Sequence, residues 1–206
     1  PGHADFSAEM ERTLQVLDYA VLVVSGTDGV QAHTRTLWKL LAGCGTPVFV
    51  FVNKMDRPGT DRETIMRELA KELGDGFVES AEDGTLNEDE AAMAGENLME
   101  EYLAEGSLSD QSLAHAIEER LIFPVFFGSA LNNFGVQELL NCFVEIAPSP
   151  RPTKAEERMV SPEENKFTGF IFKITANIDP NHRSCIAFCK VCSGKFQRNQ
   201  PYLHVR

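Results

Sequence analysis

The sequence predicts an α/β fold with a doubly wound, mainly parallel sheet, followed by the start of an antiparallel β-barrel domain. Short, continuous apolar runs alternate with segments whose apolar residues recur at helical spacing. This alternation is typical of a parallel sheet covered by helices on both faces. A proline-rich stretch then separates these segments from two β-rich runs near the end of the chain.

The expected strands of the sheet are unbroken apolar runs, which is typical of parallel strands that are buried on both faces. Asp61 is expected to cap the helix that follows it. The expected order is helix 5–19, strand 20–24, helix 30–41, strand 48–52, helix 62–73, loop 75–87, helices 88–105 and 110–120, strand 123–127 and helix 136–146. A ligand is expected beyond the carboxyl ends of these strands.

The domain organisation follows from the change in composition after residue 147. Residues 1–147 are expected to form the α/β domain, with an acidic helical insert at about 75–120. Residues 148–165 contain four prolines and are interpreted as a linker. Residues 166–206 are expected to supply the first strands of a β-barrel that is incomplete in this chain.

The charge and the apolar runs exclude some classes of partner. The formal net charge is −12, and the excess acid is concentrated between Glu68 and Glu119. A DNA-binding protein, or one that holds RNA through a broad basic face, usually has the opposite balance. No apolar run is long enough to cross a bilayer, so we expect no membrane partner.

The five cysteines favour reduced thiols in a cytoplasm, because the count is odd and no secretory signal is visible. Three of them, Cys185, Cys189 and Cys192, raise the possibility of a zinc site. Strand alternation would place Cys185 and Cys189 on one face and Cys192 on the other. This spacing favours small, buried apolar residues over a metal site.

The strongest local motif is Asn53-Lys54-Met55-Asp56, which directly follows a predicted buried strand. The Asp56 carboxylate can accept two hydrogen bonds from a planar N–H and NH₂ edge, which guanine has and adenine lacks. Lys54 can lay its methylene stem along the ring, and Asn53 can tie neighbouring loops together. The alternative interpretation is an ordinary polar turn that ends a strand.

Two weaker motifs accompany it. Gly128-Ser129-Ala130 follows the third predicted strand, where small residues can bring backbone N–H groups close to a ligand carbonyl, although such a tripeptide is more often a simple turn. Pro1-Gly2-His3 precedes a predicted helix, whose start favours anions. A histidine so close to the first residue is usually incidental when considered by itself.

Together these segments resemble the translational GTPases related to elongation factor G. The first part of the chain, Phe6–Gly59 and the acidic helices up to Gly106, is most similar to the ribosomal protection proteins of tetracycline resistance. A longer set of segments is most similar to bacterial peptide chain release factor 3, and we give this set more weight. It comprises 124–130, 166–174, 176–183 and 193–196.

The resemblance implies a role for each matching residue. Gly2 would sense the γ-phosphate through its backbone, and His3 would orient the attacking water as the catalytic residue. Asn53, Lys54 and Asp56 would read guanine, and the backbone amides of Ser129, Ala130 and Leu131 would contact its oxygen. The helix from Asp5 would be the second switch. The implied ligand is GTP or GDP, and the implied partners are the ribosome and the decoding release factors.

One departure from the family pattern is large. The sequence contains no G-x-x-x-x-G-K-[ST] loop, so the phosphate cradle and the Mg²⁺ ligands are expected upstream of this chain. The family resemblance therefore implies a GTPase domain without its N-terminal strands, with GTPase activity in the full-length protein. The isolated chain is expected to be a fragment that is inactive by itself and that self-associates through its open sheet edge. An elongation-factor-G-like or ribosomal protection role stays open as the alternative.

Overall fold

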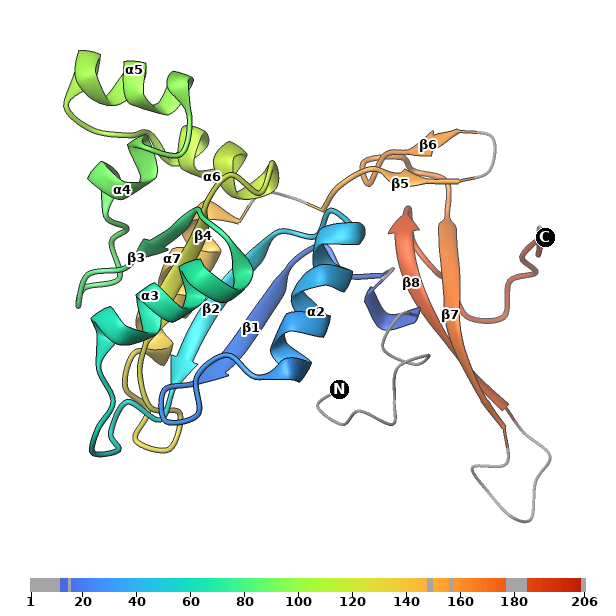
Figure 1. Ribbon diagram of the computed structural model, residues 1–206. Helices are drawn as coiled ribbons and strands as arrows, with labels where there is room; N and C mark the ends of the chain where they lie inside the picture. Colours follow the sequence, from blue (N-terminus) through green and yellow to red (C-terminus); the bar gives the residue numbers. More distant parts are fainter. Residues whose placement is uncertain (1–11, 15, 148–149, 156–157, 177–184, 205–206) are drawn as a thin grey trace. The chain divides into compact units, whose positions relative to one another are not determined.

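The structure is a computed structural model, and it describes residues 12–14, 16–147, 150–155, 158–176 and 185–204 (Figure 1). The contacts between residues divide the chain into two compact units. The described part of the first unit is residues 17–147, and the described part of the second unit comes from the remaining ranges.

The first unit is built on a four-stranded sheet in which every pairing is parallel. Its strands are β1 (Ala20–Ser25), β2 (Val48–Asn53), β3 (Phe77–Glu79) and β4 (Phe123–Phe127). Their order in the sheet is β1-β2-β4-β3. The predicted α/β fold with a mainly parallel sheet is therefore confirmed, and β2 and β4 lie next to one another at its centre.

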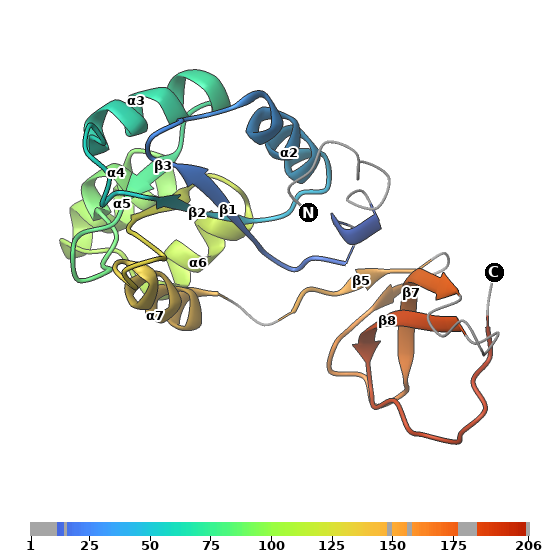
Figure 2. The same cartoon turned by 90° about the horizontal axis from the view of Figure 1, so that it is seen from below.

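Helices cover both faces of this sheet, as the doubly wound prediction requires. α2 (Ala32–Gly43) and α3 (Arg62–Leu73) lie on one face, and α6 (Asp110–Glu118) and α7 (Val136–Ile146) lie on the other (Figure 2). α3 begins where the sequence predicts, because the Asp61 carboxylate accepts a hydrogen bond from the backbone N–H of Thr64 at 2.9 Å. Side-chain acceptors at this position satisfy N–H groups that have no partner within the helix.

The core forms because the residues of β2 point alternately to the two faces and both faces are covered. Phe49 and Phe51 belong to the same buried cluster as Phe126, together with residues of α6 and α7. Burial along β2 is nearly complete, and Val48, Val50 and Val52 have no exposed surface. This burial holds the carboxyl ends of β2 and β4 in fixed positions.

The acidic insert differs from the prediction in two places. The predicted single helix over 88–105 is two helices, α4 (Glu88–Ala92) and α5 (Glu96–Glu105). Gly95 lies at the N-cap of α5 in an extended conformation, so the helical spacing of the sequence continues across a break in the backbone. The predicted loop 75–87 contains β3, a three-residue strand whose Phe77 pairs with Phe123 of β4.

Acidic side chains of the insert also hold its own backbone. Glu90 Oε2 accepts a hydrogen bond from the N–H of Glu79 in β3, and Glu88 Oε2 accepts one from the N–H of Leu108, both at 2.9 Å. A part of the acidic surplus therefore has a structural role within the unit.

The second unit is antiparallel. β5 (Thr153–Lys154) pairs with β6 (Met159–Val160), and β7 (Thr168–Ala176) pairs with β8 (Cys185–Ser193). The stretch 148–165, interpreted as a linker, thus contains a small pair of strands. The antiparallel strands expected from residue 166 onward are present as β7 and β8.

The cysteines of β8 correct one expectation. Cys192 is buried, but Cys185 and Cys189 are exposed, so these two are not buried apolar residues. β7 and β8 form a two-stranded sheet, and a face of such a sheet stays open unless another layer covers it. Among the described residues, no helix is long and apolar enough to span a membrane.

Candidate functional site

The predicted site residues Asn53, Lys54, Asp56 and 129–131 lie at the edge of the sheet where the carboxyl ends of the central strands β2 and β4 meet. Asn53 is the last residue of β2, and Gly128 directly follows β4. The two strands are parallel neighbours in which Val52 pairs with Phe127. Since the carboxyl ends of adjacent parallel strands meet, the loop after β2 and the loop after β4 lie side by side.

Direct hydrogen bonds join these two loops. The backbone N–H of Ala130 donates to Asn53 Oδ1 at 2.9 Å, although the two residues are 77 positions apart. The N–H of Met55 donates to the carbonyl oxygen of Gly128 at 3.0 Å. Asn53 Oδ1 also accepts from the N–H of Lys54 at 2.8 Å. One asparagine side chain therefore orients its own loop and the neighbouring one.

The backbone turns sharply after Asn53. Lys54 has φ = 68°, a left-handed conformation that is uncommon for a residue other than glycine and that recurs at functional sites. The N–H of Arg57 then donates to the carbonyl oxygen of Lys54 at 3.1 Å, which closes a turn that contains Asp56. Asp56 therefore lies close to the carboxyl end of β2.

The carboxylate of Asp56 remains able to accept hydrogen bonds. Its side chain is 27% exposed, and its ion pair with Arg57 Nε is long, at 4.0 Å. A partly shielded carboxylate with two acceptor oxygens suits a ligand edge with two parallel donors.

Lys54 reaches across to a third loop, the one after β1. Its Nζ lies 3.5 Å from Asp28 Oδ2. The same oxygen accepts hydrogen bonds from Ser25 Oγ at 2.6 Å and from Thr27 Oγ1 at 3.2 Å. The hydrogen bond from Ser25 has the largest effect in lowering the pKa of Asp28 below its ordinary value, and the bond from Thr27 lowers this pKa further. Asp28 is therefore a fixed anion beside the ammonium group of Lys54.

The loop after β4 is closed on itself. Ser129 is buried, and it exchanges two backbone hydrogen bonds with Phe134. A Cβ on Gly128 would overlap the carbonyl oxygen of Phe134, so the close approach requires glycine at this position. Between these anchors Ala130 is exposed, and 81% of Leu131 is exposed. The loop therefore lies at the surface, but it differs from the expectation for its amides. The N–H groups of Ser129 and Ala130 already donate to Phe134 and Asn53, which leaves the amide of Leu131 as the one suited to contact a ligand.

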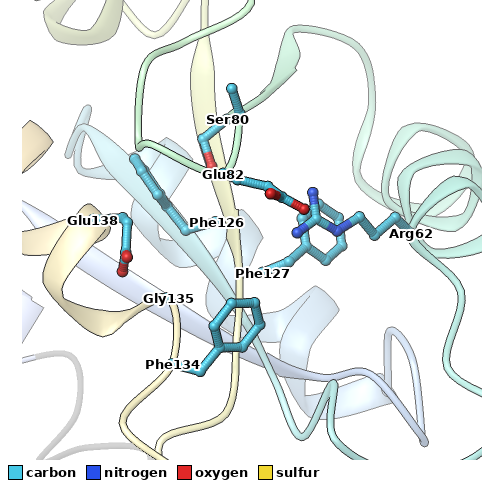
Figure 3. A pocket seen from close by; sticks show the side chains of 9 residues that line it. Arg62, Ser80, Glu82, Phe126, Phe127, Phe134, Gly135 and Glu138 are labelled. Atoms are coloured by element: carbon cyan, nitrogen blue, oxygen red, sulfur yellow. The ribbon is translucent and has the colours of Figure 1, made fainter.

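A small cavity lies beside the carboxyl ends of β3 and β4 (Figure 3). Its volume is about 10 Å³, which is room for roughly one water molecule. The Arg62 guanidinium lies 5.1 Å from the centroid of the Phe127 ring at its wall. Ser80, Glu82 and Phe134 also line it. This cavity is too small for a nucleotide base, and the candidate site rests on the contacts among Asn53, Asp56 and the loop after β4.

The remaining predicted residues, Gly2 and His3, lie outside the described residues. Within the described part of the chain, no group of three or more His, Cys, Asp or Glu side chains could hold a metal ion. The geometry of the site therefore rests on the loops that follow β1, β2 and β4.

Family comparisons match both units. Residues 1–149 match the family model described as the elongation factor Tu GTP binding domain, and residues 166–206 match the model described as elongation factor G domain 2. The chain belongs to the elongation factor Tu GTP-binding domain family. In this family context, the edge formed by Asn53, Asp56 and Ala130 lies in the GTP-binding domain.

Among curated proteins the chain is similar to peptide chain release factor 3. It is 37% identical to that protein from Listeria monocytogenes, over 96% of this chain and 45% of the relative. It is 36% identical to the one from Symbiobacterium thermophilum, over 100% of this chain and 47% of the relative. The chain thus spans about half the length of the curated relatives it matches.

The fold is similar to that of a crystal structure of a protein from Thermus thermophilus. The TM-score is 0.71 at 23% identity, and the match covers 94% of this chain and 34% of that chain. At this sequence identity the match supports the fold of the chain alone. It agrees with an α/β domain that is followed by antiparallel strands.

Sequence reasoning did not give Asp28 a role in the site. Its contact with Lys54 depends on which strands are neighbours. The available signal was its position after β1, since a residue there can reach the end of β2 when the two strands pair.

Proposed function

We propose that the protein is a GTP-binding and GTP-hydrolysing translation factor of the peptide chain release factor 3 type, which acts on the ribosome. The observation that carries the nucleotide assignment is the hydrogen bond from Ala130 N–H to Asn53 Oδ1. It joins the turn that carries Asp56 to the loop after β4, in a chain of the elongation factor Tu GTP-binding domain family.

Guanine is read by complementary donors and acceptors. The two oxygens of Asp56 accept from the N1–H and the exocyclic NH₂ of guanine, an edge that adenine lacks. The family resemblance assigns the backbone amides of Ser129, Ala130 and Leu131 to the guanine oxygen. The N–H groups of Ser129 and Ala130 already donate to Phe134 and Asn53, so the amide of Leu131 is the one that fits this role. An adenine in the same place would leave the carboxylate without donors, and an unpaired polar group of this kind is costly. The stem of Lys54 lies along the ring.

Hydrolysis would use residues near the first residue of the chain. The family resemblance assigns Gly2 to the γ-phosphate and His3 to the orientation of the attacking water. Phosphoryl transfer depends mainly on positioning and on neutralising charge, which Mg²⁺ supplies when it is bound with GTP. The described residues hold no ligand set for that ion. We expect its ligands, and the phosphate cradle, in sequence outside these 206 residues.

The type of factor rests on similarity to release factor 3 over nearly the whole chain. Its role would be to remove decoding release factors from the ribosome after termination, in the cytoplasm where translation occurs. The match of residues 166–206 to elongation factor G domain 2 supports a second candidate, an elongation-factor-G-like or ribosomal protection GTPase.

Two assays on the full-length protein test the proposal. Ribosomes should stimulate its GTP hydrolysis, and it should release a decoding release factor from post-termination ribosomes in the presence of GTP. Ribosome-stimulated hydrolysis without any release of that factor would favour the second candidate. The 206-residue chain by itself should hydrolyse no GTP, with or without ribosomes, because the charge-neutralising cradle is missing from its sequence.

A further inference from the structure

The turn after β1 packs directly against the loop after β2. Ser25 pairs with Asn53 in the sheet, and the N–H of Gly26 donates to the carbonyl oxygen of Asn53 at 2.7 Å. A Cβ on Gly26 would lie 2.8 Å from Met55 Sδ and 3.2 Å from the carbonyl oxygen of Asn53, so the two loops approach each other closely. The position of Asp28 is therefore tied to the position of the base-reading loop.

This turn is held rigidly on its other side as well. The N–H of Gly29 donates to the carbonyl oxygen of Ser25 at 2.8 Å, and the N–H of Val30 donates to Glu68 Oε1 of α3 at 2.8 Å. Ser25 Oγ and Thr27 Oγ1 both donate to Asp28 Oδ2. The Asp28 carboxylate is therefore fixed by its own turn.

Lys54 is different, because it is a long and flexible side chain. Ordering such a chain costs conformational entropy, which lowers affinity if the cost falls at the moment of ligand binding. The interaction of Nζ with Asp28 Oδ2 at 3.5 Å restrains the far end of the side chain before any ligand arrives. The near end is already fixed by the left-handed backbone of Lys54.

We propose that Asp28 is a positioning residue, which holds the ammonium group of Lys54 so that the methylene stem lies ready along the guanine ring. The inference rests on the proposed function, since it assumes that a guanine base occupies this edge. Asp28 itself touches no part of the nucleotide in this arrangement, and it acts through Lys54.

The pair should contribute to binding and very little to stability. The side chains of Lys54 and Asp28 are 52% and 48% exposed, and exposed ion pairs add little to folding. A purely structural role for Asp28 would instead appear in thermal stability. Raising the salt concentration should weaken the effect on binding, because exposed charges are screened.

A double-mutant cycle in the full-length protein tests the proposal, with a fluorescent GDP as the probe. Asp28→Asn and Lys54→Met should each weaken GDP binding by about three- to tenfold, because the stem is no longer held in advance. Asp28→Asn should have no further effect in a Lys54→Met background. The melting temperatures should stay near that of the parent, and the loss in Asp28→Asn should shrink at high salt.

Asp83→Asn is the matched control. Asp83 also lies in a loop after a strand and accepts bonds from the N–H and the Oγ1 of Thr85, at 3.0 and 2.6 Å, but its loop follows β3 at the far edge of the sheet. Its replacement should leave GDP affinity unchanged. Equal losses in Asp28→Asn and Asp83→Asn, or losses that multiply in the double mutant, would overturn the positioning role.

A separate variant, Asp56→Asn, distinguishes failure of the positioning role of Asp28 from failure of the proposed function. If Asp56→Asn leaves GDP affinity at the level of the parent, guanine is not read at this edge and the proposed function fails. If Asp56→Asn loses GDP while Asp28→Asn does not, the positioning role alone is wrong. Should Asp28→Asn fold poorly, Lys54→Met compared with Lys54→Arg gives the same test, because arginine keeps a cation for Asp28 and methionine does not.

Discussion

The backbone N–H of Ala130 donates a hydrogen bond to Oδ1 of Asn53 at 2.9 Å, which joins the ends of β4 and β2. A main-chain bond from Met55 to Gly128 runs alongside it. Both bonds form within the protein itself, so the edge that we propose reads the base is assembled before a ligand binds. Preorganisation of this kind raises affinity, because less ordering is left for the binding step.

Asn53→Ala should therefore weaken both nucleotide binding and the fold. The change removes the acceptor for two N–H groups, those of Ala130 and Lys54. We expect the free energy of unfolding to fall by about 1–2 kcal/mol and nucleotide affinity to fall about tenfold or more. Chemical denaturation and nucleotide titration of the full-length variant measure the two effects.

Asn141→Ala is the control for this prediction. Asn141 is exposed on α7, and its Oδ1 accepts a hydrogen bond from Gln137 Nε2 within the same helix. Its replacement should change the free energy of unfolding by less than about 0.5 kcal/mol and should not affect nucleotide binding. Equal effects of the two substitutions on binding would show that Asn53 has no special role.

Gly29→Ala should destabilise the protein more than Gly45→Ala. The two glycines have nearly the same left-handed φ, +64° and +63°, so an alanine is strained at both, by about 1–2 kcal/mol. A Cβ at Gly29 would also overlap the Glu68 carboxylate, whereas nothing lies within 4 Å of a Cβ at Gly45. Glu68 would have to move and lose its bond to Val30, at a further cost of about 1–2 kcal/mol. Denaturation midpoints that are equal for the two variants would contradict this reading.

Cys142 should be the slowest of the described cysteines of the first unit to react with a thiol reagent. Burial raises the pKa of its thiol to about 12, and the negative charges of Glu145 and Asp110 add to the shift. At a pH of about 8 the group is therefore almost wholly the unreactive neutral thiol. Cys44 is exposed and should be alkylated first. Mass spectrometry after timed iodoacetamide treatment measures the order in which the two cysteines are alkylated. Alkylation in denaturant confirms that both can react. Labelling of Cys142 as fast as Cys44 in the native protein would be inconsistent with the buried α7 face.

The isolated chain should self-associate through β1. In the described part of the chain β1 pairs on one side with β2, and it exposes 46% of Val21 and 58% of Val23. Open strand edges with apolar side chains tend to pair with other chains. Val23→Lys should reduce the association seen by light scattering, whereas Leu103→Lys should not, because Leu103 is 77% exposed on α5 instead. A monomer at high concentration would count against this expectation.

The strands of the sheet could be predicted because burial on both faces leaves a clear pattern. β2 is a continuous apolar run, and Asp61 marks the start of α3 through a local hydrogen bond. β3 could not be predicted in this way, because a three-residue strand carries too little pattern and depends on pairing with β4. The break between α4 and α5 was missed for a related reason, since apolar spacing continues through Gly95 while the backbone does not.

The residues of the candidate site could be predicted from the sequence, whereas several of the contacts between them could not. The position of Asn53 after a buried strand indicated the edge, and the family resemblance indicated Ala130. The left-handed backbone of Lys54 and its contact with Asp28 could not be predicted. Both depend on how three loops pack together, and short-range sequence patterns do not record that packing.

The specificity of Asp56 is the central claim, because a guanine nucleotide site requires that carboxylate. Asp56→Asn replaces one acceptor with a donor, which opposes the donors of guanine but can satisfy the additional carbonyl of xanthine. The mismatch should cost roughly 1–3 kcal/mol or more, a loss of about ten- to a hundredfold in affinity. Asp61→Asn is the matched control, since Asp61 caps α3 and an asparagine can also serve as a cap.

Competition titration of the full-length Asp56→Asn protein with GTP and xanthosine triphosphate is the most direct measurement. We expect the variant to lose GTP and to gain xanthosine triphosphate, with its fold unchanged and with Asp61→Asn still selective for GTP. If Asp56→Asn instead binds GTP as tightly as the parent, Asp56 does not read guanine, and the assignment of this edge as the nucleotide site is wrong.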